Sequence, residues 1–323
     1  MRSERGFALL GVMLVVALLT VVVLELTVAM RLEASAGRSF KDQLVASHLA
    51  EAAVQQALQE VSSQAPIPAV DERGGLVFYR IVPGSARPAR LPVLRRERVP
   101  FGGGEFSYRI TDEQARLNLN SAPPARVSRL LQAMGLDRRE RDVVVDSLQD
   151  WKDADDLVHA NGAESLDYYL KLPVPYHARN APLQDPAELL QIRGVTRELY
   201  EGQEGRPGLA ELTTVFGRDV VNINTAPGPV LAALGLSEAE ITDVVQSRAR
   251  APYTVVPGRF ATRGLGVGSQ IFRVEAEGWV GGVRQARIVA IVQRQTTRPA
   301  GAEPDDLAAF GLALLTWREG GYR

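Results

Sequence analysis

Residues 7–30 read FALLGVMLVVALLTVVVLELTVAM, an apolar run that is broken only by Thr20, Glu25 and Thr27. At about 1.5 Å per residue a helix of this length covers roughly 36 Å, more than a hydrocarbon core of about 30 Å. The short flank before it is polar and carries Arg2 and Arg5, so we expect that flank to stay in the cytoplasm. The run therefore predicts one transmembrane helix, with Glu25 as an interfacial charge near its outer end.

The residues around this helix separate three interpretations of it. A cleaved secretory signal would use the Ala34-Ser35-Ala36 box, but the apolar core of such a signal is typically 7–15 residues, shorter than this run. A plain signal anchor is the second interpretation. The third comes from Gly6-Phe7, which directly follows a charged leader and precedes the apolar helix. This junction resembles the type III leader of type IV pilins and type II secretion pseudopilins.

That resemblance implies how the N-terminus is processed. In the family, a prepilin peptidase cuts after the Gly and methylates the new amine, which would make Phe7 the first mature residue after Gly6. The family usually has Glu at the fifth mature position, where this chain has Gly11. Such a Glu can pair with a neighbouring subunit's amine in an apolar filament core, where an unpaired charge is costly. Its omission resembles pseudopilin component K, which caps the filament tip.

Composition sets few limits beyond this segment. The 323 residues include 37 Lys+Arg and 38 Asp+Glu, and the formal net charge is -1. This balance gives no global reason to expect a nucleic-acid or anionic-lipid partner. The chain has no Cys, which excludes disulfides, thiolate zinc sites and thiol nucleophiles.

The pattern after the membrane run predicts a pilin-like head. Apolar residues from Leu44 to Val61 recur at helical spacing, so the helix is expected to continue as an amphipathic helix to about residue 62. Strand patterns follow at 76–82 and 105–110, and a hairpin pattern at 271–280 and 283–292 surrounds Gly281-Gly282. The segment between Arg80 and Arg98 carries six Arg and one Glu, and is interpreted as a solvated loop.

We therefore expect an α+β protein in which an N-terminal transmembrane helix packs on an antiparallel sheet, with a large all-α domain inserted between strands. The expected divisions are a leader (1–6), a transmembrane helix (7–30) that continues to about 62, a head (63–111 and 258–297), the insertion (112–257) and a C-terminal tail (298–323). The tail includes an apolar stretch, 307–317, that is expected to pack back as a short helix or strand.

The expected insertion contains a near-duplicate. Residues 117–123 read LNLNSAP and residues 221–227 read VNINTAP, at an offset of 104. Each copy leads into an apolar helix, a Gly-Leu turn and a second amphipathic helix, and the pairs Asn120/Ser121 and Asn224/Thr225 are predicted N-caps.

The second copy resembles the helix-hairpin-helix modules that bind DNA phosphates through backbone amides. This gives an alternative function, a membrane-anchored DNA-binding protein of a competence or type IV pilus system. The charge argues against it, because residues 112–200 carry 15 acidic and 11 basic residues. We expect protein-packing hairpins and no nucleic-acid partner.

An acidic stretch between the copies has the spacing of a cation loop. Asp153 and Asp155 lie two residues apart, and Glu164 is twelfth when Asp153 is counted as first. Carboxylates at positions one and three with a Glu at twelve form the skeleton of a calcium loop. Position six is Val158 where an EF-hand has Gly, so this is not an EF-hand. Candidates for the remaining ligands are backbone carbonyls, water, Asp150 and Asn161. A capped helix end followed by a solvated acidic loop explains the same spacing equally well, and the two interpretations stay open.

No catalytic constellation accompanies these carboxylates. Paired acids can serve acid–base hydrolysis, but no substrate-groove pattern lies nearby, and we expect no enzymatic activity. The histidines, His48, His159 and His177, have no ligand spacing to one another, so solvent exposure is expected for each.

The same stretch sharpens the family resemblance. Asp150-Trp151-x-Asp153-x-Asp155 is followed by Gly162-Ala163-Glu164, Tyr168, Pro175-Tyr176, Asn180, Glu188-Leu189, Gly194 and the second motif copy at 222–227. In order and spacing these residues resemble component K of type II secretion systems, over residues 1 to about 295.

This resemblance implies a pseudopilin fold with calcium bound in the inserted domain by Asp153, Asp155 and Glu164, and less securely by Asp150. It also implies an inner-membrane, single-pass protein with its globular part in the periplasm. The implied partners are prepilin peptidase and the other minor pseudopilins, components I, J and H, at the tip of the pseudopilus.

Overall fold

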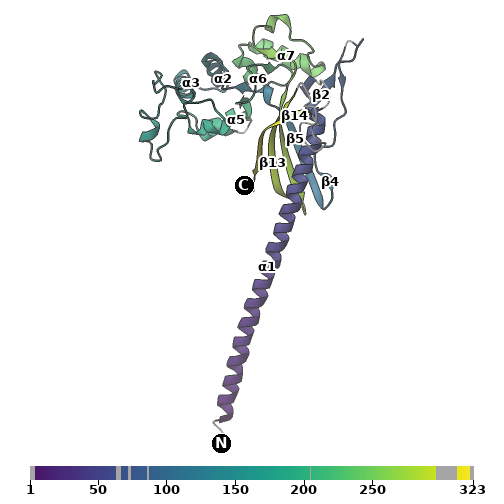
Figure 1. The fold of residues 1–323 in the computed structure, drawn as a ribbon, viewed down its shortest axis with the longest axis vertical. Helices are drawn as coiled ribbons and strands as arrows, with labels where there is room; N and C mark the ends of the chain where they lie inside the picture. The colour runs from purple at the N-terminus through teal and green to yellow at the C-terminus, as the bar shows by residue number, and fades with distance from the viewer. Residues whose placement is uncertain are drawn as a thin grey trace.

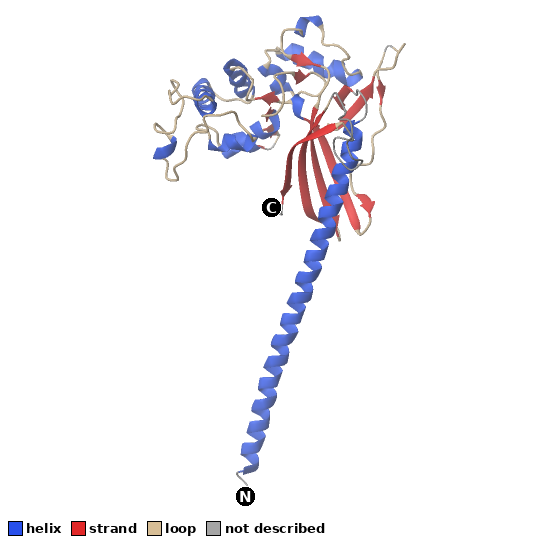
Figure 2. Ribbon diagram, viewed as in Figure 1, coloured by secondary structure: helices blue, strands red, loops and turns tan. Residues whose placement is uncertain are grey.

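A single helix dominates the computed structural model, which describes residues 4–62, 67–71, 74–85, 87–203, 205–295 and 311–320. Helix α1 (Glu4–Ser62) runs unbroken through 59 residues. Figures 1 and 2 show its N-terminal half projecting from the molecule and its C-terminal half packed on a sheet. The projecting half has a window of mean hydropathy 2.8 with no buried residue, and within the described residues α1 is the one helix long and apolar enough to cross a membrane.

The packed half of α1 presents small residues to the sheet. Ala46, Ala50, Ala53 and Ala57 are fully buried, which brings the helix backbone close to the strands. A Cβ on Gly278 would lie 1.8 Å from the carbonyl oxygen of Ala46, so this strand position requires glycine. The predicted amphipathic continuation of the helix is confirmed in its position and its buried face.

The sheet under α1 has five antiparallel strands in the order β14-β13-β12-β5-β4. Their bounds are β4 (Val99–Phe101), β5 (Gly104–Asp112), β12 (Ile271–Val280), β13 (Val283–Arg294) and β14 (Leu312–Gly320). The predicted hairpin is confirmed, because β12 and β13 pair around Gly281 and Gly282, both with positive φ. A smaller sheet is formed by β1 (Ile67–Val70), β2 (Leu76–Arg80) and β3 (Ala89–Arg90).

The segment between Arg80 and Arg98 is more firmly held than a solvated loop would be. Arg96 donates hydrogen bonds to the carboxylate of Glu60 on α1 and to the carbonyl of Leu76 at 2.8 Å. The hydroxyl of Tyr108 also donates to Glu60. The interpretation as a solvated loop is therefore wrong at Arg96, because a partly buried acid on the helix attracts this guanidinium.

The C-terminal stretch forms part of the sheet. Residues 298–323 are expected from the sequence to be a tail with a short packed element, and strand β14 within it pairs with β13 from Arg294↔Leu312 to Arg287↔Gly320. Leu312 is buried in the core between α1 and the sheet. The other expected tail residues, 298–310 and 321–323, lie outside the described residues.

Residues 113–270 form a second body between β5 and β12, which are neighbours in the sheet. It has its own core of buried residues. Its α-helices are α2 (Pro124–Ala133), α3 (Arg138–Lys152), α4 (Arg197–Glu201), α5 (Leu209–Leu212), α6 (Gly228–Ala233) and α7 (Glu238–Arg250). The 3-10 turns are η1 (Glu113–Ala115), η2 (Tyr169–Lys171), η3 (Pro186–Gln191) and η4 (Gly258–Phe260). Because Phe260 and Leu265 belong to this core, the body extends past the expected boundary at residue 257.

Short two-stranded ladders also occur in this body, so the expected all-helical composition differs from what is observed. Strand β6 (Leu117–Asn118) pairs in parallel with β9 (Thr213–Thr214), and β10 (Val221–Asn222) pairs in parallel with β11 (Leu265–Gly266). A third ladder joins β7 (Gly202–Gln203) to β8 (Arg206–Pro207). The β6–β9 and β10–β11 ladders form because each motif copy is extended just before its helix and lies beside a segment from later in the chain.

The two motif copies repeat the same hydrogen bonds. Asn120 Nδ2 donates to two backbone carbonyls and its Oδ1 accepts from the amide of Leu183 at 2.9 Å. Asn224 makes the equivalent three bonds, and its Oδ1 accepts from the amide of Tyr253 at 2.7 Å. The predicted N-caps are therefore wrong. Pro123 and Pro227 occupy the N-cap positions, because the Asn side chains bond to distant backbone segments instead of the helix ends.

A buried polar junction joins this body to the sheet. Asp112, the last residue of β5, accepts side-chain hydrogen bonds from Asn222, Thr225 and Ser269. Beside it, the fully buried carboxylate of Glu113 pairs with Arg116 and Arg273. The second motif copy is thereby fixed to the end of the sheet that lies far from the exposed half of α1.

Candidate functional site

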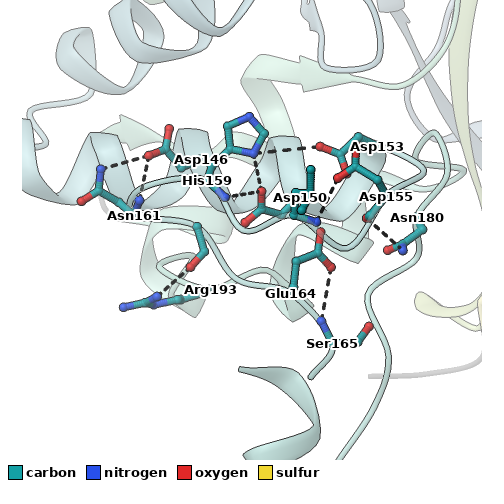
Figure 3. A network of polar contacts seen from close by, with 12 residues as sticks. Asp146, Asp150, Asp153, Asp155, His159, Asn161, Glu164, Ser165, Asn180 and Arg193 are labelled. Carbon is teal, nitrogen blue, oxygen red and sulfur yellow. Dashed lines mark hydrogen bonds and ion pairs between the residues drawn. The ribbon is translucent and has the colours of Figure 1, made fainter. Parts of the chain in front are cut away.

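The acidic loop begins at the C-terminus of α3. The capping box of Asp137 and Glu140 starts this helix, and Asp153 ends it by donating its backbone N–H to the carbonyl of Gln149 at 2.9 Å. Asp150 lies in the last turn and its side chain is fully buried. Figure 3 shows the chain then folding back past Asp150 toward Glu164.

Asp150 is the centre of the loop. Its Oδ1 accepts from the backbone N–H of His159 at 3.1 Å and also contacts Nδ1 of the same histidine. Its Oδ2 is buried and has no hydrogen-bond partner among the described residues. A Cβ on Gly162 would lie 1.9 Å from this Oδ2, so only glycine lets the returning chain pass so close. The carbonyl of Gly162 is held in turn by Arg193 at 2.8 Å.

Four side-chain oxygens of the loop are buried and unpaired in the described part of the chain. They belong to Asp150 (Oδ2), Asp153 (Oδ1), Glu164 (Oε1) and Asn180 (Oδ1). Buried oxygens without donors are costly, and a hard cation such as calcium takes oxygen ligands of these types. The donor set therefore fits calcium.

The electrostatics of the loop would favour a bound cation. Burial, reinforced by the charges of Asp150, Asp153 and Asp156, raises the pKa of Glu164 to about 7. Burial and the neighbouring Asp155 and Asp150 also raise the pKa of Asp153. A divalent cation at this place would favour the ionised carboxylates and reverse both shifts.

The predicted ligands are placed unequally. Asp150 and Asp153, together with His159, have ligand atoms within 4.8 Å of one another. Glu164 is buried in the part of the loop that returns toward α3, and Figure 3 shows it beside Asp150. Asp155 lies outside the 4.8 Å group, and its Oδ1 accepts from the amide of Leu157 at 2.9 Å in a local turn. The assignment of calcium to these residues stays a prediction.

Two further residues, which spacing did not single out as ligands, lie close to the acidic loop. His159 has a half-exposed side chain, so the expected exposure holds only in part, since its ring bonds to a buried acid. That bond, with the charges of Asp150 and Asp153, raises the pKa of His159. Asn180 has a positive φ of 47° and donates from Nδ2 to the backbone of Asp155 and the carboxylate of Asp156. The left-handed backbone conformation of Asn180 is seen only in the structure, so no specific signal for this residue is present in the sequence.

Aromatic side chains that precede and follow the acidic loop in the chain pack against one another. The Trp151 and Tyr169 rings meet edge to face with centroids 5.3 Å apart, and Tyr176 lies 5.2 Å from Tyr169. Tyr176 donates its hydroxyl to the carbonyl of Gln191 at 2.7 Å. Trp151 lies next to Asp150 in the chain, so its indole is placed to report on the state of the acidic loop.

The helical hairpins do not offer free anion sites at their turns. At the N-terminus of α3, Asp137 and Glu140 form a reciprocal capping box, and Ser237 and Glu240 do the same at α7. These side chains satisfy the amides that would otherwise hold a phosphate, and each box places a carboxylate there.

The residues predicted for N-terminal processing lie at the edge of the described chain. Residues 1–3 of the expected leader are outside it, and Gly6 and Phe7 belong to the first turns of α1. Gly11 lies in the exposed part of α1, and beyond the helix's own backbone and its chain neighbours nothing lies within 4 Å of an added Cβ. Processing after Gly6 stays a prediction.

Two segments of the chain match family models described as type II secretion system protein K, over residues 110–204 and residues 221–266. Each segment holds one copy of the duplicated motif. A protein K of Pseudomonas aeruginosa is 29% identical over 97% of this chain and 96% of its own length. The chain belongs to the protein K family of type II secretion systems.

Other members of the protein K family align over shorter regions. The protein K of Pectobacterium carotovorum is 31% identical across 47% of this chain, and the match spans 52% of that protein. A putative protein K of Escherichia coli K12 is 28% identical across 62% of this chain and 60% of its own length. The chain thus spans about half to nearly all of the length of these relatives.

A solved structure has the same fold. It is a crystal structure of a GspK-GspI-GspJ complex from enterotoxigenic Escherichia coli, matched with a TM-score of 0.64 at 18% identity. The match covers 90% of this chain and all of the matched chain. At this identity the likeness concerns the fold, which is the α+β arrangement of an N-terminal apolar helix, sheets and helices.

Proposed function

We propose that the chain is a minor pseudopilin of a type II secretion system, which assembles with other minor pseudopilins at the pseudopilus tip to start the filament and support protein export. The observation that carries the proposal is α1. Its N-terminal half is apolar and exposed, while its C-terminal half is the central core element of the head. One helix thereby serves both as membrane anchor and as structural core, and membership of the protein K family agrees with this role.

The proposed partners are components I, J and H. The solved relative forms a complex with GspI and GspJ, which supports the first two. Gly11 supports the place at the tip, because a subunit without Glu there cannot pair the amine of a neighbour. The body of residues 113–270 supports it as well, since so large an insertion would obstruct subunits stacked above it.

The proposed topology follows from the helix and its leader. Arg2 and Arg5 keep the leader in the cytoplasm, prepilin peptidase cuts after Gly6, and the inner membrane holds the apolar half of α1 in a single pass. The head and the mostly helical insertion then lie in the periplasm, in the pilin-like arrangement of a helix on an antiparallel sheet with a domain inserted between strands.

Calcium is part of the proposal as a structural ion. Asp150, Asp153 and Glu164 would hold it. Asn180, whose Oδ1 is buried without a partner among the described residues and whose Nδ2 donates to Asp156, is a candidate for a further oxygen ligand, and Asp155 stays a ligand predicted from spacing. The ion supplies charge neutralisation to three acids that burial brings together, and no catalytic role is proposed for it. The DNA-binding alternative is not supported, because the hairpin turns carry their own carboxylates and the relatives are secretion proteins.

Intact mass of the membrane-extracted protein tests the proposed processing. A mature chain that begins with methylated Phe7 is expected, and retention of Met1 to Gly6 or cleavage at Ala36 would contradict it. Co-purification from the native membrane tests the assembly. Components I and J are expected with the tagged protein, and their absence would overturn the proposed function.

A further inference from the structure

The ring of His159 lies between two acids of the loop. Its Nδ1 contacts Oδ1 of Asp150 and lies 4.0 Å from Oδ2 of Asp153. Figure 3 shows both acids on the side of this nitrogen. The ligand atoms of the three side chains all lie within 4.8 Å of one another. One ion could therefore contact an imidazole nitrogen and two carboxylates here.

The backbone holds this ring in place. The N–H of His159 donates to Oδ1 of Asp150 at 3.1 Å, and its carbonyl accepts from the N–H of Gly162 at 2.9 Å. Asp150 itself is fully buried in the last turn of α3. Both backbone groups of His159 are thus engaged, so the ring stays beside the acids even when its own contact with Asp150 changes.

Unpaired oxygens show that the contact with His159 does not complete this cluster. Oδ2 of Asp150, Oδ1 of Asp153 and Oε1 of Glu164 are buried and have no hydrogen-bond partner within the described part of the chain. Asp150 and Glu164 are 0% and 1% exposed. Buried oxygens in this state are costly, so these atoms and the imidazole together form a donor set for a cation.

The kind of donor distinguishes one cation from another. Calcium takes about six to eight ligands, all oxygens, and the spacing would include Asp155 among them. That residue lies outside the group with His159, and its Oδ1 accepts from the amide of Leu157 instead. Zinc binds in a tetrahedron of imidazole nitrogens and carboxylate oxygens. An imidazole near three carboxylates is therefore a better donor set for zinc than for calcium.

We propose that the acidic loop also binds zinc, with Nδ1 of His159 as a direct ligand. Carboxylate oxygens of Asp150, Asp153 and Glu164 are the other ligands. Calcium and zinc then compete for the same acids, and zinc binds more tightly because only zinc uses the imidazole. The side chain of His159 is 47% exposed, which gives an ion a route from solvent. The inference rests on the structural ion of the proposed function and adds a ligand and a second metal.

Metal titration of the full chain in detergent, after treatment with EDTA and its removal, tests this site. ZnCl2 is expected to raise the melting temperature at lower concentrations than CaCl2. His159→Gln should weaken zinc binding by about 10–100-fold or more, the range for losing even a partner outside the ligand shell. Its calcium response should remain, which shows that the loop is folded. The exposed His177→Gln, outside the group, is the matched control and should respond as wild type.

Cobalt is a second probe, because Co²⁺ in a tetrahedral nitrogen–oxygen site absorbs visible light more strongly than hydrated Co²⁺. Adding CoCl2 should produce this band in wild type and in His177→Gln, ZnCl2 should abolish it, and His159→Gln should lack it.

Three results would overturn the inference: no stabilisation by zinc, equal zinc affinity in wild type and His159→Gln, or an equal loss of zinc and calcium binding in that variant. The last result would mean that the ring only positions the acids. The proposed function fails separately. If calcium alone does not stabilise the wild type, its calcium part is wrong, and if components I and J do not co-purify, its assembly is wrong.

Discussion

Asn222 donates a hydrogen bond from Nδ2 to Oδ2 of Asp112 at 2.9 Å, and so joins the second motif copy to the last residue of β5. Thr225 and Ser269 donate to the same oxygen, each at 2.6 Å. Burial raises the pKa of Asp112, and these bonds oppose the rise. This one carboxylate gathers three segments that are far apart in the chain.

Asp112→Ala is therefore expected to destabilise the protein strongly. Buried donors left without an acceptor cost about 1–3 kcal/mol each, so the loss should be about 3 kcal/mol or more. For a body of this size that lowers the melting temperature by about 6–12 °C. Thermal unfolding of the full chain in detergent measures it, with the exposed Asp167→Ala as control. Equal melting temperatures for the two variants would contradict the importance of the junction.

Calcium is expected to raise the melting temperature of the wild type. A site filled at a hundred times its Kd adds about 2.7 kcal/mol. Glu164→Gln and Asp153→Asn should lose most of this rise, because each replaces a buried carboxylate. Trp151 offers a second readout, since its fluorescence should change on calcium titration in a chain that also carries Trp279→Phe and Trp317→Phe. An undiminished response in Glu164→Gln would show that the ion binds elsewhere.

Without calcium, stability is expected to depend on pH in one direction. Glu164 has a folded pKa of about 7 against an ordinary value of 4.5, so the folded state holds more protons than the unfolded state between these values. Stability must then fall as pH rises through this window. The raised pKa values of Asp153 and His159 act with the same sign.

In EDTA the melting temperature should thus be higher at pH 5.5 than at pH 7.5, with a smaller difference in Glu164→Gln. Added calcium should flatten the profile, because the ion keeps the acids ionised. A melting temperature in EDTA that rises with pH over this range would contradict the raised pKa of Glu164.

Gly162→Ala is expected to disrupt the loop. The new methyl carbon would lie 1.9 Å from Asp150 Oδ2, so the returning chain must move away from α3. Calcium-dependent stabilisation should fall and amide exchange over residues 153–164 should rise. Gly268→Ala is the matched control, since that position has open space around it and no positive φ. Equal exchange in the two variants would contradict the close approach.

Two elements could be predicted from the sequence because their signals lie within short, continuous stretches of it. The long helix follows from one apolar run and one amphipathic stripe, and the β12–β13 hairpin follows from alternation around Gly281-Gly282. Strand β14 was predicted only as a short packed helix or strand, because its pairing with β13 spans a polar segment and is not local. The N-caps failed for the same reason, since Asn120 and Asn224 bond to backbone that is remote in sequence.

The candidate site was predictable to a similar degree. Spacing alone brought forward Asp153 and Glu164, but it ranked Asp155 above Asp150, whereas the structure buries Asp150 and leaves Asp155 exposed. Helical geometry explains this order, because Asp150 lies on the inward face of α3 and Asp155 follows the helix end. The approach of His159 and Asn180 depends on how the loop folds, which spacing does not encode.

The unbroken course of α1 has a mechanical consequence. A helix of 59 residues is about 90 Å long, and the head is joined to it without a flexible linker. A tilt of about 10° at the membrane end therefore displaces the far end by about 15 Å. A small change in the tilt of the membrane-embedded half of α1 therefore causes a large displacement of the body of residues 113–270. Bilayer thickness and neighbouring helices, which set this tilt, would thus control the position of that body.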